Sequence, residues 1–381
     1  MTASGSDTRT SSWENSVMGS SAHDPLFRWR DNPVTRRSLL AGLGAVGVFA
    51  AVDLGSIAVA KGWIGRGASL TRQSFIDGFV SVYGRHPGFR RNHAKGLALT
   101  GYFDSNGRGA ELSTAQVFTA GRTPVVGRFS LAGGNPFGAD TPGAARGLGL
   151  AFGFPGGEQW RTAMLNTAVF PDNSPQGFYD RLLASKPQPD TGKPDPEAMK
   201  RFYAAHPETV AATAVNKQNP PTTGFADSIF FSLNAFMFVD AAGKRTPVRW
   251  SLHPDQSALP PGRGDNGLFD AAARQLRSGP LRWRLLLIIG EPGDPTDDAT
   301  LPWPAERRSI EAGTVTLTGA STEAPGNARD VNFDPLVLPD GIEPSDDPLL
   351  SARSAVYAAS YRARAGEAYS TPAVVVTADR P

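Results

Sequence analysis

The sequence predicts an α+β fold built around an antiparallel eight-stranded β-barrel with flanking helices. Short apolar runs with strand-like alternation, bounded by turn residues, recur between residues 95 and 290. Between two of these runs, Asp240-Ala-Ala-Gly243 is typical of a hairpin turn, which favours antiparallel pairing. The counts of 32 Pro and 42 Gly indicate many turns and argue against a helical bundle. A barrel of eight strands has a size that can enclose a ligand.

The expected strands follow from the local alternation of apolar and polar residues. Two segments without this pattern, 184–195 and 320–349, are rich in Pro and Asp and are expected to be loops, the second an ordered wrapping loop. The expected strands are 95–104, 113–119, 124–131, 147–155, 163–170, 229–240, 246–252 and 282–290.

The folded part is expected to begin near Ser69 with a capped amphipathic helix that ends at Gly84. Helical patterns also occur at 196–213, 267–277 and 350–365.

Composition excludes several classes of protein. Apolar residues make up 40% and charged residues 19%, which supports a substantial core. The net charge of +2 gives no electrostatic case for binding nucleic acid, which needs a concentrated basic face. Cysteine is absent, so disulfides, thiolate metal sites and Cys nucleophiles are excluded. The composition leaves the oligomeric state open.

The amino-terminal region differs from the rest of the chain. Residues 1–33 are polar and are expected to be disordered. In residues 34–60, the pair Arg36-Arg37 directly precedes an apolar stretch, as in a twin-arginine export signal. We therefore expect the folded domain, 61–381, to lie outside the cytoplasm, in the periplasm.

Two interpretations of residues 34–60 stay open. Ala58-Val59-Ala60 has the small-x-small form of a cleavage site, which favours a removed signal. The 23 residues from Ser38 to Ala60 are also enough to cross a bilayer as a single-pass anchor, although Asp53 would be costly there. A buried core helix is the less favoured alternative.

Arg353 and Tyr357 lie four residues apart on an expected helix, so their side chains share one face. A guanidinium beside a phenol stabilises the phenolate, which is a good anionic ligand for ferric iron. Such a pair is also common on helix surfaces, so it becomes informative only together with other motifs.

Those motifs occur in order along the chain. Arg90-Arg91-Asn92-His93-Ala94-Lys95-Gly96 leads into Gly101-Tyr102-Phe103, and this pattern resembles the distal-histidine motif of the catalase superfamily. The resemblance, closest to the catalase-related, minimal haem peroxidases, implies a catalase-like haem domain. Its further blocks are Arg122-Thr123-Pro124, Gly127-Arg128-Phe129-Ser130, Arg146-Gly147, Asn166-Thr167, and finally Arg353, Tyr357 and Arg364.

The resemblance implies three catalytic residues. His93 takes the distal position above the haem and moves a peroxide proton from one oxygen to the other. Asn166 hydrogen-bonds and polarises the peroxide. Ser130 orients the imidazole of His93.

The resemblance also implies how haem is bound. Tyr357 is the axial iron ligand, tuned by Arg353. Haem b is the expected cofactor, because covalent attachment needs Cys. The candidates for contact with its propionates are Arg90, Arg128 and Arg364, and those for packing on the porphyrin are Phe178, ranked first, with Phe129 and Phe170.

The chain departs from full catalases in ways that bear on function. It ends about two dozen residues after Tyr357, so no C-terminal helical domain is expected, and Asn234-Ala235-Phe236 stands in the strand where the family has a proximal histidine. A trimmed shell opens the haem to larger donors. The predicted activity is therefore a peroxidase in which hydrogen peroxide or an organic hydroperoxide forms a ferryl haem that oxidises an unidentified organic reductant.

Two alternatives remain. One is a catalase proper, or a relative that rearranges fatty-acid hydroperoxides. The other is a non-enzymatic haem carrier at the cell envelope, which would have no use for His93, Ser130 and Asn166 together.

Overall fold

The computed structural model describes residues 70–153 and 157–376. The expected disordered segment 1–33 and the expected export signal or anchor at 34–60 lie outside these residues. Within the described ranges, no helix combines the length and apolar character that a bilayer crossing requires.

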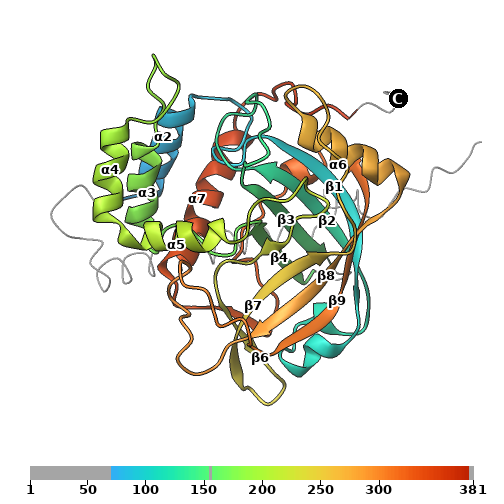
Figure 1. Cartoon of the computed structure of the whole chain (residues 1–381). Helices are drawn as coiled ribbons and strands as arrows, with labels where there is room; N and C mark the ends of the chain where they lie inside the picture. The colour runs from blue at the N-terminus through green and yellow to red at the C-terminus, as the bar shows by residue number, and fades with distance from the viewer. Residues whose placement is uncertain (1–69, 154–156, 377–381) are drawn as a thin grey trace, which may run out of the picture.

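Eight antiparallel strands close into a barrel, as the sequence predicts (Figure 1). Around the barrel the order is β7-β5-β4-β3-β2-β1-β9-β8, and β8 pairs back to β7. Two short strands, β6 (Phe236–Val239) and β10 (Ile342–Pro344), continue the sheet from β7. The barrel strands are β1 (Gly96–Ser105), β2 (Gly121–Leu131), β3 (Arg146–Gly153), β4 (Gln159–Leu165), β5 (Phe230–Phe231), β7 (Arg245–Pro254), β8 (Leu281–Ile289) and β9 (Ser309–Ser321).

Glycines allow the neighbouring strands β1 and β9 to approach closely. The register between these strands shifts at Thr100/Gly101. A Cβ at Gly101 would lie 2.1 Å from the carbonyl oxygen of Thr316, and one at Gly313 would lie 2.2 Å from that of Asp104. Gly313 also has a φ of 145°, which L side chains rarely adopt. A larger residue at either position would force these strands apart.

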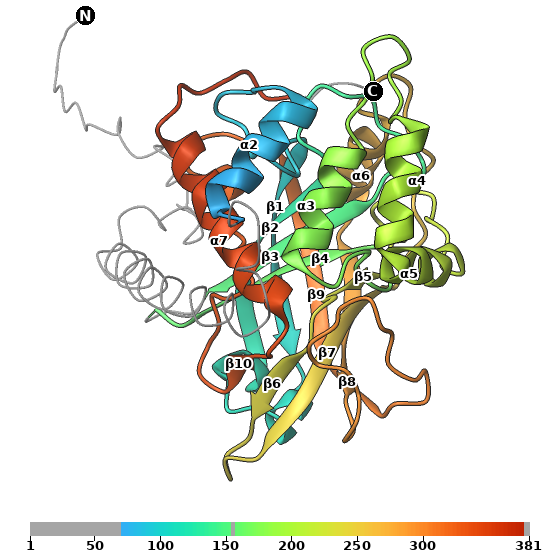
Figure 2. The same ribbon diagram turned by 90° about the vertical axis from the view of Figure 1, so that its left-hand side faces the viewer.

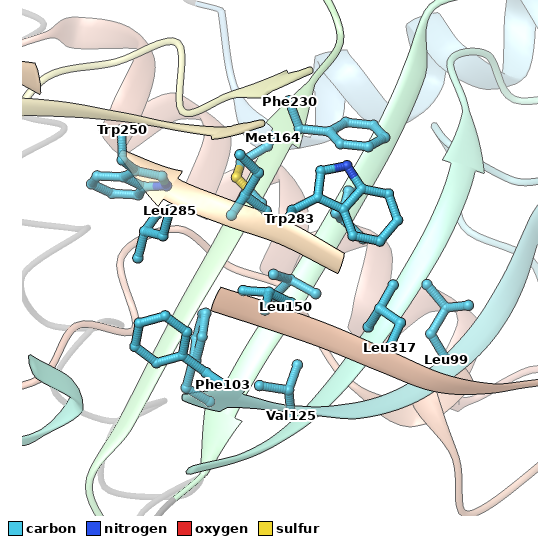
Figure 3. Packing of buried hydrophobic residues seen from close by; sticks show 14 of the residues in the cluster. Leu99, Phe103, Val125, Leu150, Met164, Phe230, Trp250, Trp283, Leu285 and Leu317 are labelled. Atoms are coloured by element: carbon cyan, nitrogen blue, oxygen red, sulfur yellow. The ribbon is translucent and has the colours of Figure 1, made fainter. Parts of the chain in front are cut away.

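The barrel interior is filled by side chains (Figure 3). On β3, Leu148, Leu150 and Phe152 belong to this core, whereas the alternate residue Ala151 packs in a separate cluster on the outer face. The fold class is confirmed, but the interior leaves no room for the cofactor expected there, because the barrel's own side chains fill it. The largest fully buried side chains of the barrel interior include Trp160, Trp250, Trp283, Phe103, Phe129 and Phe230.

Most of the helices cover one side of the barrel. Figure 1 shows α2, α3, α4, α5 and α7 gathered there, with α6 apart from them. Figure 2, turned toward that side, shows α2, α3 and α7 in front of strands β1 to β4. The helices are α2 (Arg72–Tyr83), α3 (Pro175–Ala184), α4 (Pro196–Ala205), α5 (Pro207–Lys217), α6 (Gly267–Ser278) and α7 (Pro348–Ala365).

Local sequence explains where the two helices nearest the cavity begin. Thr71 caps α2, because its hydroxyl accepts a hydrogen bond from the backbone N–H of Ser74 at 3.1 Å. Asp347 caps α7 by accepting from the N–H of Leu349 at 2.8 Å, and Pro348 follows at the first helical position.

Some expected elements differ in the structure. Segment 113–119 holds a short 3-10 helix (Gln116–Phe118) in place of a strand. The expected helix 196–213 is two helices, because Pro207 starts a new helix directly after His206. The expected strand 229–240 divides into β5 and β6. Helix α3 and strand β9 are not expected from the sequence.

Candidate active site

A cavity lies between the outer face of the barrel wall and the helices α2, α3 and α7. Its empty space measures about 1140 Å³, including the part that opens to solvent. Polar side chains from the segment before β1, from β2 and from α7 line it together with apolar side chains from α2 and α3. Of the residues predicted from the sequence, the lining includes His93, Ser130, Arg90, Arg128, Arg353, Tyr357, Arg364, Phe170 and Phe178.

His93 is held firmly at the barrel wall. It lies just before β1 with a φ of 53°, a left-handed conformation that is uncommon for residues other than glycine. Its Nδ1 lies 3.0 Å from the hydroxyl oxygen of Ser130 on β2, and its backbone N–H donates to Oδ1 of Asn92 at 3.0 Å. A backbone strained in this way persists only where the surroundings fix it, and such positions cluster at functional sites.

Gly147 on β3 makes room for this pair. It lies opposite Ser130 in the register of β2 and β3. A Cβ at Gly147 would lie 2.7 Å from the Ser130 hydroxyl oxygen and 3.2 Å from both Nδ1 and Cε1 of His93. Only glycine therefore leaves room for the imidazole and the hydroxyl beside this strand.

The imidazole of His93 is neutral at physiological pH. Burial, followed by the positive charges of Arg128, Arg353 and Arg90, lowers its pKa from 6.5 to about 3. A neutral imidazole has one ring nitrogen free to accept a proton. With Nδ1 against Ser130, that nitrogen can be Nε2.

Tyr357 and Arg353 line the cavity from α7. Tyr357 is half-buried and packs against a cluster that includes Ala98, Val126 and Phe333 on the outer wall of the barrel. Its hydroxyl makes no hydrogen bond to another described residue. Arg353 donates to the carbonyl oxygen of Ala163 on β4 at 2.9 Å, which ties the helix to the wall.

Asn234 joins Arg353 to the start of α7. Arg353 donates to its Oδ1, and its Nδ2 donates to Oδ2 of Asp347 at 2.7 Å. Burial raises the pKa of Asp347 to about 6, although the hydrogen bond from Asn234 acts in the opposite direction. Asn234, in the stretch where a histidine is expected, thus connects the helix cap to the arginine one turn before Tyr357.

Three arginines converge at one edge of the cavity. Arg128 is 3% exposed and donates to both carboxylate oxygens of Glu323, at 2.8 and 2.9 Å. Arg90 also reaches Glu323, at 3.4 Å, and donates to the carbonyl oxygen of Val331 at 2.7 Å. Arg364 donates to the carbonyl oxygens of Arg329 and Val331. Gly96 permits this packing, because its Cβ would lie 2.2 Å from Cζ of Arg128.

The positive charges in this cluster destabilise one another. Burial, then Arg364 and Arg128, lowers the pKa of Arg90 well below its usual value. Burial also lowers the pKa of Arg364 to about 10. Buried guanidinium groups that repel one another favour an anionic ligand, and a carboxylate suits their forked geometry.

Two of the predicted site residues, Asn166 and Phe129, do not line the cavity. Oδ1 of Asn166 accepts a hydrogen bond from the backbone N–H of Arg146 at 2.8 Å. Phe129 lies in the barrel core and stacks on Phe225, with 4.5 Å between ring centroids. Phe178 and Phe170 both reach the cavity and stack on each other.

Similarity to known proteins decides the family. A family model described as "Catalase" matches residues 84–259. A "Catalase-related peroxidase" from Synechococcus elongatus is 38% identical over 352 residues, which cover 89% of this chain and 96% of the relative. The chain belongs to the catalase family.

Other members of the catalase family show how far the likeness extends. A "Catalase-related peroxidase" from Mycolicibacterium paratuberculosis is 32% identical and covers 78% of this chain and 96% of its own. The "Catalase" of Rattus norvegicus is 27% identical, and the match spans 56% of its length. Among solved structures, a bacterial catalase matches with a TM-score of 0.65 at 21% identity, covering 78% of this chain and 61% of its own.

The cavity of this catalase-family chain fits haem. A phenol on α7 and an imidazole on the barrel wall both reach it, and buried guanidinium groups gather at one edge. This donor set suits a flat, iron-containing ring with carboxylates at its edge.

The sequence does not single out Glu323, Asp347 or Gly147 as parts of the site. Glu323 lies inside the stretch 320–349, which shows no periodic pattern, and only the fold brings it to the arginines. Gly147 is part of a motif, but its closeness to His93 depends on strand pairing.

Proposed function

We propose that this member of the catalase family is a haem-dependent peroxidase. It uses hydrogen peroxide, or an organic hydroperoxide, to oxidise an organic donor. The observation that carries the proposal is that two side chains line the same cavity. One is the neutral imidazole of His93, which hydrogen-bonds to Ser130, and the other is the phenol of Tyr357 on α7. Two relatives that cover most of this chain bear the name catalase-related peroxidase.

Tyr357 is proposed as the iron ligand, and the bound haem would supply the redox chemistry of peroxide reduction. Haem b is the proposed form, because the sequence has no Cys for covalent attachment. Arg353, fixed by Ala163 and Asn234, places a positive charge on the same face of α7 as the phenol.

On the opposite face, His93 is proposed to move the peroxide proton. Nε2 accepts the proton from one peroxide oxygen and returns it to the other, while Ser130 keeps the ring in place through Nδ1. Asn166 lies outside the cavity lining, with its Oδ1 accepting from the N–H of Arg146, and its amide Nδ2 is the group proposed to polarise the peroxide. Arg90, Arg128 and Arg364 are proposed to bind the propionates.

Replacing the proposed iron ligand tests the cofactor assignment. Tyr357→Phe should lose haem or shift the Soret band, because the chain has no Cys to replace the phenolate. The measurement is the absorbance spectrum of protein reconstituted with hemin. Tyr361→Phe, one turn further along α7, is the matched control and should keep the wild-type spectrum. A Tyr357→Phe spectrum equal to wild type would remove the assignment.

Enzyme assays separate peroxidase from the alternatives. At equal peroxide, a peroxidase oxidises a dye faster than it releases dioxygen, and a catalase does the reverse. A haem carrier would keep its hemin-dependent peroxide turnover after His93→Ala, whereas the proposed role of His93 predicts a loss of about 100-fold or more.

We also propose that residues 34–60 direct export, as a cleaved signal or a single-pass anchor, and that the haem domain acts in the periplasm. The support is Arg36-Arg37 before the apolar stretch. Arg36→Lys with Arg37→Lys should leave the protein in the cytoplasmic fraction. Unchanged export of this variant would exclude the twin-arginine route.

A further inference from the structure

Glu323 occupies an unusual position among the arginines at the cavity edge. Among the described residues, it is the only carboxylate that hydrogen-bonds to Arg90, Arg128 or Arg364. Its side chain is 12% exposed, so solvent does little to screen it. The bond to Arg128 is bidentate, which fixes the plane of that guanidinium.

The cluster keeps an excess of positive charge. Three guanidinium groups face one carboxylate, which leaves two positive charges without a side-chain counter-ion in the described residues. The neighbouring Arg329 adds none, because it pairs with Asp330 at 2.8 Å. The carbonyl groups of Ala328, Arg329 and Val331 accept hydrogen bonds from the cluster but carry no net charge.

We propose that Glu323 is a positioning residue that holds Arg128 and Arg90 in place to bind the porphyrin carboxylates. Its negative charge also limits the net charge of the cluster to two positive charges, which match a ligand with two carboxylates. This inference rests on the proposed haem-binding function. It assigns to Glu323 control of the positive charge that faces the porphyrin carboxylates, a role separate from iron binding or peroxide chemistry.

The surroundings keep Glu323 ionised and the arginines in place. Burial opposes ionisation, but the charges of Arg128, Arg90 and Arg364 outweigh it and lower the pKa of Glu323 to about 2. The guanidinium of Arg128 already lies against Gly96 of β1, so it has no room to move further in that direction. The carboxylate is therefore a fixed charge of the site, present whether or not a ligand is bound.

The test compares hemin with hemin dimethyl ester, which has the same iron and ring but no charged carboxylates. In wild type, hemin should bind more tightly than the ester. Glu323→Gln adds one net positive charge to the cluster, which favours the ligand with two carboxylates. The dissociation constant of the ester divided by that of hemin should therefore rise about tenfold or more. An unchanged ratio would overturn the proposal.

Thermal unfolding gives a second measurement. Without ligand, Glu323→Gln leaves the three arginines without their counter-ion, and its midpoint should fall by roughly 5–15 °C. Adding hemin should then raise the midpoint of the variant more than that of wild type, because the propionates replace the lost carboxylate. An equal or smaller rise would contradict the proposal.

Two further variants complete the design. Asp140→Asn breaks another buried ion pair, with Lys95 at 2.7 Å, away from the cavity lining. It should lower stability without changing the ratio of dissociation constants. The double variant Glu323→Gln/Arg90→Gln restores the original net charge and should return the ratio toward the wild-type value. If it keeps the ratio of Glu323→Gln, or if Glu323→Gln fails to fold even with hemin, the proposal fails.

The wild-type titration separates this inference from the function on which it rests. If wild-type protein does not bind hemin, the proposed function fails. If wild-type protein binds hemin and only the predicted change in Glu323→Gln is missing, the inference about Glu323 fails and the proposed function stands.

Discussion

Gly147 offers a way to disturb the proposed catalytic histidine without removing any functional group. Gly147→Ala places a Cβ 2.7 Å from the Ser130 hydroxyl oxygen and 3.2 Å from Nδ1 of His93. Real Cβ atoms essentially never approach another heavy atom to within 3.0 Å. Either the hydroxyl rotates away, which breaks its hydrogen bond to the imidazole, or the imidazole moves away from the strand.

The expected loss follows from this geometry. The hydrogen bond between Ser130 and His93 is worth about 0.5–1.5 kcal/mol. A displacement of about 1 Å in a catalytic group can cost roughly 100-fold in rate. Peroxidase turnover per bound haem should therefore fall by about 10- to 100-fold. Overpacking should also reduce the free energy of unfolding by about 1–3 kcal/mol.

The assay is peroxide-dependent dye oxidation, normalised to haem content. Gly143→Ala is the matched control, because its Cβ would have no heavy atom within 4 Å, and it should behave as wild type. In a Ser130→Ala background, Gly147→Ala should cost less, since the closest clash is gone. Wild-type turnover per haem in Gly147→Ala would refute the role given to this contact.

Two further predictions concern pH and the ligand-free protein. His93→Gln should make the stability of the chain less sensitive to acid. The pKa of His93 is lower in the folded chain than in the unfolded chain, so wild type loses stability as pH falls from about 6.5 toward 3. Between pH 7 and 5 this loss is at most about 2 kcal/mol. Urea unfolding at the two pH values measures this, and an identical loss in the variant would contradict it. Asp347→Asn keeps a helix-capping side chain but removes a carboxyl whose pKa is raised to about 6 on folding. Wild type should gain about 1 kcal/mol from this proton between pH 7 and 5, and the variant should show no such gain in the same experiment.

Strands and helices with strong local patterns were predictable. The alternation in β1, β2 and β7 and the helical pattern of α6 agree with the structure to within a few residues. Strand β9 (Ser309–Ser321) is missed because Thr, Gly and Ala dominate it and blur the alternation. The seven residues 113–119 alternate like a strand but form a short 3-10 helix that buries Val117 and Phe118 in the core.

The site was predictable where motifs identify it. His93, Ser130 and Tyr357, far apart in the sequence, line one cavity as the resemblance implies. The position of that cavity outside the barrel could not be read from the strands, because alternation shows that each strand has two faces but not which one meets the helices. Glu323 depends on the path of a loop, which no periodicity describes.

The two faces of the cavity come from distant parts of the chain, and this affects when the cofactor can bind. Tyr357 follows His93 by 264 positions, and α7 closes the cavity against a wall made by β2, β3 and β4. A nascent chain that has emerged only as far as β9 (Ser309–Ser321) carries His93 but not Tyr357, so it lacks the proposed iron ligand. With Tyr357 as the proposed iron ligand, haem can load only after α7 has been synthesised, and the release of α7 alone would be enough to let the cofactor go.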